Sequence, residues 1–231
     1  MCRCNNLKGT VLVKEQDVAL FCKTLCRGSR QMGISLTRTQ MDQMVCHAVQ
    51  LENWNRKINL TAITDPGAMA RKHFLDAIAV QRFVKHETTV LDMGSGGGFP
   101  GLPLKVLNGH MQVVLVDGSR KKVHFLKHVI RMLGTGGIDA IHGRIEDFHQ
   151  DPDFALRFDA VLARGFASLS SIAGLAAPLL HPKGTIYALK SPTAAEEITP
   201  ALKKQFVIQC DYYTLPLEET ERCLIRLALR P

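Results

Sequence analysis

Apolar residues recur at helical spacing in the first part of the chain. The stretches Lys14–Arg30 and Thr37–Trp54 each carry an apolar stripe that fits one face of a helix. Thr37 and Gln40 form a Ser/Thr-x-x-Gln capping box, which marks the start of the second stretch as a helix start. The pattern therefore predicts two amphipathic helices in this region.

A third helix is predicted from Asp65-Pro66, because an aspartate cap followed by proline at the first helical position is a common helix start. We expect this helix to run to about Val84. The segment Asn53–Thr61 is predicted to be a polar loop between the second and third helices. It holds Trp54, the only tryptophan of the chain, which we interpret as a core anchor rather than a platform for base stacking.

After Thr88 the pattern changes to short apolar runs that alternate with helical segments. Such alternation indicates βαβ units and a parallel sheet that is covered on both faces. Strands are predicted at Thr89–Met93, Gln112–Val116, Asp139–His142, Ala160–Ala163 and Thr185–Leu189. Helices or helical turns are predicted at Gly101–Leu107, Lys121–Leu133, Ile145–Phe148 and Leu169–Leu180.

The end of the chain departs from this alternation. Phe206–Tyr213 and Arg222–Leu229 are two strand-like segments, and only the short stretch Leu215–Thr220 joins them. A connection of this length is too short for a crossover helix, so the two strands should pair antiparallel. The sheet is therefore expected to be mostly parallel with an antiparallel last strand.

Charge divides the chain at about the same place as the pattern does. Residues 1–88 hold 13 Lys and Arg against 7 Asp and Glu, whereas residues 89–231 hold 16 against 14. We therefore expect a basic N-terminal helical extension (1–88) beside a nearly neutral ligand-binding domain (89–231). A basic surface of this kind suits a polyanion. Charge alone does not distinguish RNA from DNA or from an acidic protein.

The cysteines and the apolar segments indicate a cytoplasmic protein. No run of about 18 apolar residues is present, which argues against a transmembrane helix. The N-terminal residues lack the apolar core of a secretion signal. The seven cysteines are odd in number and do not have the spacing of a metal site, so we expect reduced thiols and no metal.

The strongest chemical signal is the glycine-rich segment Val90–Gly101. A buried strand is expected to end at Asp92, and the turn after it contains Gly94 and Gly96 before a helix begins. Glycines allow the backbone to come within contact distance of a ligand, because no Cβ atom blocks the approach. In a parallel sheet such a ligand lies beyond the carboxyl ends of the strands. The segment therefore predicts a site for a nucleotide-like ligand.

The spacing Gly96-x-Gly98-x-x-Gly101 also satisfies the dinucleotide fingerprint, which on its own is a weak signal. Three features favour S-adenosylmethionine over NAD, and the third of them, at Ile145-Glu146, lies after a later strand. Asp92 precedes the glycines, where it can face the cationic methionine end of the ligand. Pro100 and Pro103 occupy the helix start, where a pyrophosphate would need free N–H groups.

Acidic residues after the next two strands support the same class of ligand. Ile145-Glu146 follows the third strand, where an adenine would be held. Asp117 ends the second strand and can accept hydrogen bonds from ribose hydroxyls under either interpretation. The glycine turn and the sheet order together predict an α/β protein with a Rossmann-like class I methyltransferase sheet, mostly parallel with the last strand antiparallel, preceded by an N-terminal helical extension.

With these residues assembled, the chain resembles the ribosomal RNA small subunit methyltransferase G family, also called glucose-inhibited division protein B. Their order and spacing are specific to this family rather than to methyltransferases at large. The matching segments are Asn53–Asn55, Asn59–Thr61, Lys72–Asp76, Leu91–Pro103, Arg120–Leu126, Arg144–Phe148, Arg164–Leu169 and Tyr187–Lys190.

The resemblance implies an enzyme that transfers a methyl group from S-adenosylmethionine to N7 of guanine 527 in 16S rRNA. It places cofactor contacts at Gly94, Phe99, Ile145, Glu146 and Arg164. The sequence departs from the family pattern in two places. Gly165 stands where alanine is usual, and Ser191-Pro192 replaces an expected glycine.

Methylation at N7 places few demands on side-chain chemistry. This nitrogen has an in-plane lone pair and no proton, so no general base is needed, and the product is cationic. The protein must align the two reactants, which lowers the barrier by several kcal/mol. In an A-form helix N7 faces a deep and narrow groove, so the target base must be unpaired or extruded.

Arg164 is the best single candidate near the reaction, as a positioning residue for the methionine carboxylate or for an RNA phosphate. His73 and Asn59 are expected to brace the N-terminal helices against the pocket. Arg120 and Lys121 open a helix where the dipole disfavours cations, which suggests an anionic partner there. The expected RNA contacts are Arg56, Lys57, Arg120, Lys121 and Lys190.

Two alternatives remain at this point. The chain could be an RNA-binding or ribosome-assembly protein on a methyltransferase fold, but the intact glycine turn with its acidic residues argues against that. An NAD-dependent oxidoreductase is less favoured, because no set of residues for hydride transfer is recognisable. The expected partner is 16S rRNA, within the small ribosomal subunit, and the expected state is a monomer.

Overall fold

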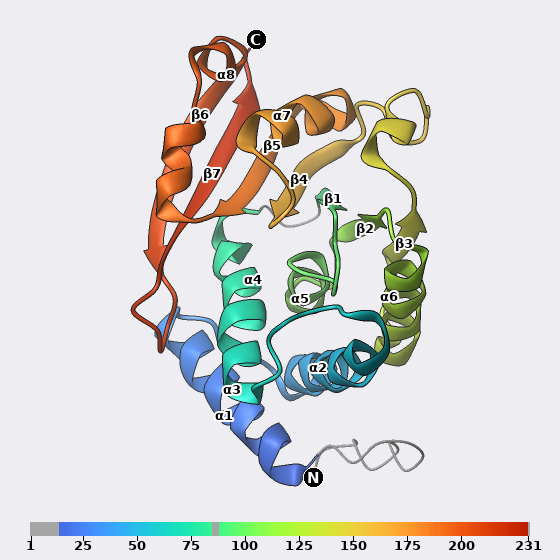
Figure 1. Cartoon of the computed structure of the whole chain (residues 1–231), viewed down its shortest axis with the longest axis vertical. Helices are drawn as coiled ribbons and strands as arrows, with labels where there is room; N and C mark the ends of the chain where they lie inside the picture. Colours follow the sequence, from blue (N-terminus) through green and yellow to red (C-terminus); the bar gives the residue numbers. More distant parts are fainter. Residues whose placement is uncertain (1–13, 85–87, 231) are drawn as a thin grey trace.

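The computed structural model describes residues 14–84 and 88–230, and its central feature is a seven-stranded sheet (Figure 1). The strand order is β3-β2-β1-β4-β5-β7-β6, and β7 pairs antiparallel with both β5 and β6. This confirms the predicted α/β fold with a mostly parallel sheet. The strands are β1 (Thr89–Met93), β2 (Gln112–Asp117), β3 (Ile138–His142), β4 (Phe158–Arg164), β5 (Leu180–Lys190), β6 (Phe206–Thr214) and β7 (Glu221–Leu229).

The strand order reverses between β1 and β4, which are neighbours and run parallel. From β1 the chain proceeds outward to β2 and β3, and it then returns to place β4 on the other side of β1. Helices leave the carboxyl ends of these two strands in opposite directions, so a crevice opens there. The turn after β1 and the residues that end β4 therefore meet at the same point.

Two N-terminal helices have the predicted starts. Helix α1 spans Glu15–Gln31, and α2 spans Arg38–Ile58. The Thr37 hydroxyl accepts from the N–H of Gln40, and the Gln40 side chain accepts from the N–H of Thr37, which confirms the capping box.

The prediction of a loop from residue 53 was wrong, because α2 continues to Ile58. Arg56 and Lys57 are exposed in this stretch, whereas Asn53 and Asn55 are half-buried. Trp54 packs against Phe125 and His128, as expected of a core anchor. Asn59 ends the helix with a left-handed φ of 49°. It is exposed, so the bracing role predicted for it is wrong. Asn55 braces instead, since its carbonyl accepts from the N–H groups of the following loop.

The third predicted helix begins at the expected cap, where Asp65 accepts from the N–H of Ala68. It is not uniform: α3 (Pro66–Met69) passes into a π-helical segment, η2 (Ala70–Leu75), then α4 (Asp76–Ala79) and a 3₁₀ turn, η3 (Val80–Phe83). π-Helical turns often occur at functional sites. This one carries His73 and is followed directly by Asp76, both of which belong to the site described below.

Strands β4 and β5 each end one residue later than predicted, so their last residues are site residues. Arg164 and Lys190 were expected just after β4 and β5, but each is the final residue of its strand. The sequence pattern also missed η6 (Pro192–Glu197) and α8 (Pro200–Gln205), which are short and begin with proline. The other helical segments are α5 (Gly101–Leu107), α6 (Arg120–Leu133), η4 (Ile145–Phe148), α7 (Leu169–Ala176) and η5 (Ala177–Leu179).

Each face of the sheet has its own buried cluster. One cluster joins α5 and α6 to the N-terminal helices, with Phe74, Leu51 and Phe125 fully buried. The other lies under α7 and α8 on the opposite face, around Phe158 and Phe206. The N-terminal helices therefore form a further layer over α5 and α6, which is visible below the sheet in Figure 1.

Helix α2 lies antiparallel to α6. Near its start, Gln43 donates to the carbonyl of Leu133 at the end of α6, and Trp54 later contacts Phe125 near the middle of α6. The last turn of α2 therefore extends toward the first turn of α6. This packing brings two separate groups of predicted RNA contacts to the same edge of the molecule.

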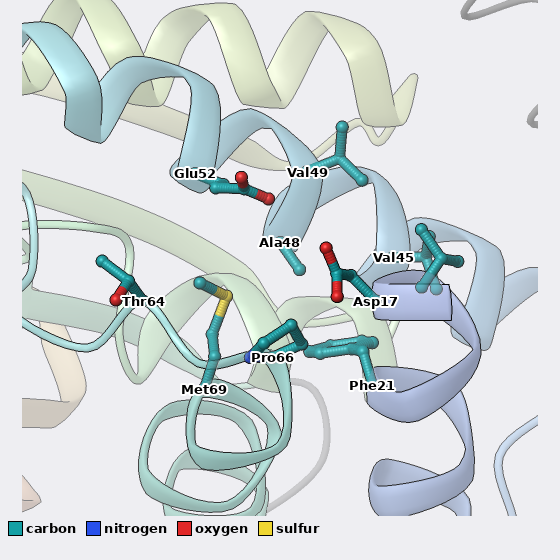
Figure 2. A pocket seen from close by; sticks show the side chains of 10 residues that line it. Asp17, Phe21, Val45, Ala48, Val49, Glu52, Thr64, Pro66 and Met69 are labelled. Atoms are coloured by element: carbon teal, nitrogen blue, oxygen red, sulfur yellow. The ribbon is translucent and has the colours of Figure 1, made fainter. Parts of the chain in front are cut away.

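A narrow pocket of about 330 Å³ lies between α1, α2 and α3 (Figure 2). Its walls are mostly apolar, with Phe21, Ala48 and Met69 among them, and Asp17 and Glu52 also line it. Two carboxylates repel a polyanion, so this part of the N-terminal layer is unsuited to contact with phosphates. The basic character of the extension is therefore uneven over its surface.

None of the helices in the described part of the chain has both the length and the apolar character that a membrane crossing requires. Across residues 14–84 and 88–230, no cluster of His, Cys, Asp and Glu could hold a metal ion. Five cysteines in these ranges are free thiols, and Cys2 and Cys4 lie outside them.

Lys105 is almost fully buried in α5, where its ammonium group donates to the carbonyls of Gly109 (2.7 Å) and Met111 (2.5 Å). It thereby holds the connection between α5 and β2. Lys105→Met keeps the apolar stem but leaves two carbonyls without their donor. We expect the free energy of unfolding in urea to fall by about 1–3 kcal/mol.

The matched control is Lys127→Met, at an exposed position of α6. It should change the free energy of unfolding by less than about 0.5 kcal/mol. Equal losses in the two variants would contradict the structural role of the buried ammonium group.

Candidate functional site

The glycine-rich turn after β1 is fastened to β2 by its own backbone. The N–H groups of Gly94 and Ser95 both donate to the carbonyl of Val116. The N–H of Gly96 donates to the Asp117 carboxylate at 2.9 Å, and the other carboxylate oxygen accepts from Ser119 at 2.8 Å. Asp117 therefore fixes the middle of the turn.

The opposite side of the turn is free of side chains at Gly96. This residue has a φ of +54°, and a Cβ atom built there would meet only the carbonyl of Gly94, at 3.8 Å. Gly94 also has a positive φ, of +68°, but its free side is covered by the ring of Phe166. A ligand can thus approach the backbone at Gly96, which is what the sequence pattern predicted for this turn.

Asp92 lies directly beneath the turn and is fully buried. One of its carboxylate oxygens accepts from the N–H of Gly101 at 2.8 Å, and the other has no hydrogen-bond partner among the described residues. Burial raises the pKa of Asp92 to about 7, against the lowering effects of the Gly101 bond and of the Arg164 charge. The carboxyl group anchors the start of α5.

The start of α5 offers little to a pyrophosphate. Gly101 donates to Asp92, while the N–H groups of Phe99 and Leu102 donate to the carbonyls of Ser95 and Gly98. Prolines occupy positions 100 and 103 and have no N–H to give. The helix start is therefore already occupied and has a carboxyl group beside it, which disfavours the dinucleotide interpretation.

Phe99 connects the turn to the N-terminal helices. Its ring is stacked between His47 and His73, with ring centroids 4.8 Å apart on each side and interplanar angles of 19° and 21°. The Nε2 atom of His47 also lies 2.7 Å from the carbonyl of Gly97. Phe99 was predicted as a cofactor contact, and its ring is buried against these helices. Any contact of its backbone with a ligand stays a prediction.

Both histidines are held in the neutral form. Burial lowers the pKa of His47 to about 4. Burial, together with the charge of Arg164, lowers the pKa of His73 to about 3. Neutral His73 can accept from Arg164 at Nδ1 (3.2 Å) and donate from Nε2 to the hydroxyl of Thr61 (2.7 Å). The predicted bracing role of His73 is confirmed by these contacts.

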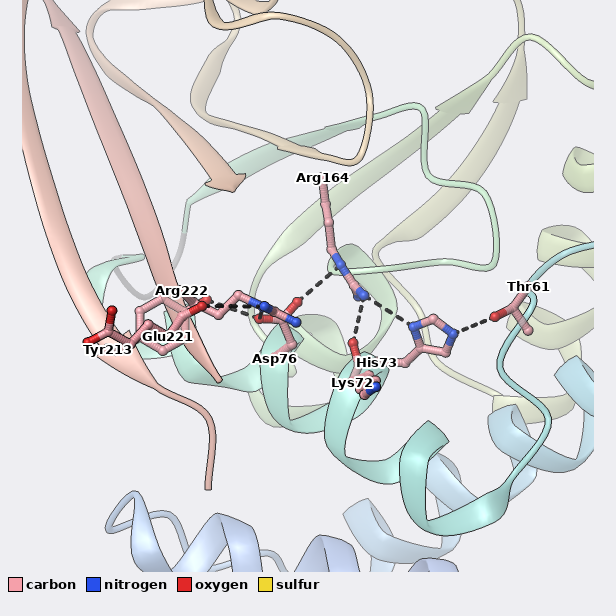
Figure 3. Close-up of polar contacts among 8 residues, drawn as sticks. All are labelled: Thr61, Lys72, His73, Asp76, Arg164, Tyr213, Glu221 and Arg222. Carbon is pink, nitrogen blue, oxygen red and sulfur yellow. Dashed lines mark hydrogen bonds and ion pairs between the residues drawn. The ribbon is translucent and has the colours of Figure 1, made fainter. Parts of the chain in front are cut away.

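Arg164 lies at the centre of a polar network at the end of β4 (Figure 3). Its Nε atom is 3.1 Å from the carboxylate of Asp76, and one terminal nitrogen donates to the carbonyl of Lys72 at 2.6 Å and to His73. The other terminal nitrogen, Nη1, is buried and has no partner in the described part of the protein. An anionic ligand would satisfy this nitrogen.

Asp76 was part of a matching segment, but the sequence gave no reason to single it out. It is buried and pairs with two arginines, Arg164 from β4 and Arg222 from β7, the latter at 3.5 Å. The hydroxyl of Tyr213 also donates to it, at 3.1 Å, and burial with this carboxylate raises the pKa of Tyr213. One carboxylate thus orients groups from three distant segments.

The residues predicted to hold an adenine lie next to Asp117. In the β2–β3 ladder Asp117 is paired with His142, so the segment that follows β3 lies at the same edge. Ile145 is buried in the cluster under α7, whereas Glu146 is exposed. Contact of either residue with an adenine stays a prediction.

The predicted RNA contacts fall into two groups. Arg56, Lys57, Arg120 and Lys121 are exposed, at the end of α2 and the start of α6. Lys190 is mostly buried, and its ammonium group lies 2.7 Å from both carboxylate oxygens of Glu197. Lys190 is therefore not a free cation in this structure.

A cavity opens at the carboxyl ends of β4 and β5, beside the Arg164 network. It contains about 940 Å³ of space, part of it open to solvent. We call it the acceptor cavity, and its walls include Arg164, Phe166, Leu189, Lys190, Glu197 and Arg222.

The pKa of Asp92 predicts how stability depends on pH. The folded protein keeps this proton up to about pH 7, whereas an unfolded aspartate releases it near pH 4. Stability is therefore lost as the pH rises between these values. Asp92→Asn has no proton to lose at this position. The free energy of unfolding of the variant minus that of the wild type should therefore increase by about 2–4 kcal/mol from the lower pH value to the higher.

Denaturant titrations at several pH values measure this difference. A destabilisation by the amide that is the same at every pH does not affect how the difference changes with pH. Asp159→Asn, at an exposed position of β4, is the matched control and should show no such gain. A constant difference between Asp92→Asn and the wild type would contradict the raised pKa.

Comparison with known proteins shows the family of the chain. The family model described as rRNA small subunit methyltransferase G matches residues 40–225. The ribosomal RNA small subunit methyltransferase G of Geobacter sulfurreducens is 38% identical over 211 residues, which cover 89% of this chain and 96% of that protein. The protein of the same name from Halalkalibacterium halodurans is 40% identical over 202 residues, 84% of this chain and 85% of that protein.

Solved structures share the fold at lower similarity. M. capricolum TrmK, solved with S-adenosyl-homocysteine, superposes with a TM-score of 0.53 at 16% sequence identity and covers 67% of each chain. This likeness concerns the fold alone. The family model, by contrast, matches from α2 to β7, and the two relatives cover most of this chain and of their own length. The chain therefore belongs to the rRNA small subunit methyltransferase G family.

Proposed function

We propose that the protein transfers the methyl group of S-adenosylmethionine to N7 of guanine 527 in 16S rRNA of the small ribosomal subunit. The observation that supports this most directly is a site built for positioning, in which the backbone of the turn is open at Gly96 and Arg164 has an unpaired nitrogen beside it. The cytoplasmic location and the monomeric state expected from the sequence stay predictions.

The residues present fit the cofactor. Gly96 would hold it by close approach of the backbone, and Arg164 has one guanidinium nitrogen left for a carboxylate. Gly94 lies under the ring of Phe166, so a cofactor contact there stays a prediction. The proposed partners of the nucleoside are Asp117 for the ribose and Ile145 with Glu146 for the adenine. When bound, S-adenosylmethionine supplies an electrophilic methyl group. Asp92 and Phe99 act from beneath the turn in this proposal, by fixing its shape and charge.

The side chains around the site support an acceptor that loses no proton. His47 and His73 have pKa values lowered to about 4 and 3, and their ring nitrogens are engaged with the turn and with Arg164. Asp92 has a pKa near 7, which would suit a general base, but its full burial keeps it from touching a substrate. N7 of guanine needs no such base.

Exposed cations at one edge support an RNA substrate. The last turn of α2 carries Arg56 and Lys57, and it extends toward Arg120 and Lys121 at the start of α6. Arg56 is paired with Glu52, but only through an exposed i,i+4 contact that is worth little. Four cations at one edge suit an RNA backbone.

The direct test is to map the modified nucleotide. 16S rRNA and assembled small subunits, both prepared without this modification, are incubated with the protein and S-adenosylmethionine. Chemical cleavage at 7-methylguanine should then appear at guanine 527. Methylation elsewhere, or at another atom of the base, would show the proposed acceptor to be wrong.

The pH dependence of the reaction gives a sharper test of the acceptor atom. With saturating RNA, the single-turnover rate should not rise about tenfold per pH unit between about pH 6 and 8, because no proton leaves N7. Asp92→Asn tests a carboxyl group whose pKa lies in that range. A steep rise that disappears in this variant, with RNA binding unchanged, would mean that the acceptor loses a proton.

Replacement of Gly96 tests the place of the cofactor. Gly96→Val should abolish the binding heat of S-adenosylhomocysteine while the protein stays folded, because the side chain would fill the open side of the turn. Gly134→Val is the matched control, since Gly134 ends α6 with a similar φ of +61° and has nothing within 4 Å of a built Cβ atom. It carries the same backbone strain away from the site. Equal loss of binding in both variants would remove the support for this placement.

A further inference from the structure

We infer that Phe166 is the platform on which the target base stacks, and that its ring also favours the charge that the base acquires on methylation. The inference rests on the proposed function, which requires an extruded guanine next to the cofactor. It adds the residue that positions this guanine. Neither composition nor spacing in the sequence distinguished Phe166 from other aromatic residues.

The exposure of Phe166 is the first observation. Its side chain is 38% exposed, and it lines the acceptor cavity. A partly exposed phenylalanine in a cavity wall leaves apolar surface in contact with water, which is unfavourable. A flat ligand that covers the ring would bury this surface and gain free energy. The other aromatic side chain with a large exposed fraction in the described residues, Tyr212, lies on β6 and does not line this cavity.

The position of the ring is the second observation. A Cβ atom built on Gly94 would lie 2.4 Å from Cδ2 and 3.0 Å from Cε2 of Phe166. The ring therefore packs directly on the glycine turn, at the boundary between the proposed cofactor site and the acceptor cavity. A base stacked on the ring would lie next to the turn, which is the place that methyl transfer requires.

The charges around the ring are the third observation. Arg164, Lys190 and Arg222 line the same cavity and are balanced in part by Asp76 and Glu197. An aromatic wall with an excess of cations suits a nucleotide, because the base can stack while its phosphates face the cations. Methylation of N7 gives the purine a positive charge, and the face of an aromatic ring attracts a cation. Phe166 is thus expected to act on the rate as well as on RNA affinity.

The test separates stacking from packing over the turn. Phe166→Leu keeps an apolar side chain against Gly94 but removes the aromatic face, whereas Phe166→Tyr keeps it. We expect Phe166→Leu to lower the single-turnover rate on 16S rRNA by about tenfold or more. Phe166→Tyr should stay within about threefold of the wild type, and so should the matched control Tyr212→Leu.

A second measurement does not depend on activity. Phe166→Trp introduces an indole whose emission should be quenched when a guanine stacks on it. The probe is an RNA hairpin with the loop sequence around guanine 527, compared with the same hairpin lacking that base. Wild-type protein, whose only tryptophan is Trp54, gives the background signal. Quenching should require the base.

Three outcomes are distinguishable. Wild-type rates in Phe166→Leu, or quenching that does not need the base, would overturn the inference. A loss of S-adenosylhomocysteine affinity in Phe166→Leu, with an unchanged rate at saturating cofactor, would also overturn it and would assign Phe166 to the cofactor turn. If the wild type itself does not methylate this guanine, the proposed function fails instead, while the hairpin measurement still decides whether a base stacks here.

Discussion

The glycine-rich turn has to leave its ligand side free of side chains, and the rest of the site follows from this constraint. A turn without side chains cannot pack itself, so it must be held from the other side. Asp117 accepts a hydrogen bond from the N–H of Gly96, and buried Asp92 accepts one from the N–H of Gly101. The imidazole of His47 contacts the carbonyl of Gly97. Each bond is made beneath or beside the turn. The open side remains available at no cost to its rigidity.

The N-terminal helices belong to this support as much as the sheet does. Phe99 follows the glycines directly, and its ring is held between His47 from α2 and His73 from the π-helical segment. The stack requires both imidazoles to stay neutral, because His73 accepts from Arg164 and both rings are out of water. The burial that lowers their pKa values therefore also keeps the arginine in place. The extension before the sheet shapes the site and does not only carry charge.

Local features of the sequence predicted the fold well. Contacts between residues far apart along the chain could not be predicted from it. The capping box at Thr37, the strand before the glycines and the antiparallel end of the sheet all follow from neighbouring residues. The end of α2 was mispredicted, because polar residues on the exposed face of a helix have the same appearance as a loop. Asp76 could not be found, because its partners Arg164 and Arg222 lie 88 and 146 positions away along the chain.

The cations of the molecule divide into two kinds with different tasks. Those near the acceptor cavity are already paired, Arg164 and Arg222 with Asp76 and Lys190 with Glu197, so they add little net attraction for a polyanion. Their orientation is fixed instead, and fixed donors suit the alignment of two reactants. Arg56, Lys57, Arg120 and Lys121 are exposed at the edge formed by α2 and α6, where Arg56 pairs with Glu52 only through an exposed contact. Long-range attraction to phosphates does not need a fixed orientation. The salt dependence of RNA affinity is therefore expected to come mainly from the exposed cations at the edge formed by α2 and α6. The alignment of the two reactants is expected to depend on the buried network around Asp76.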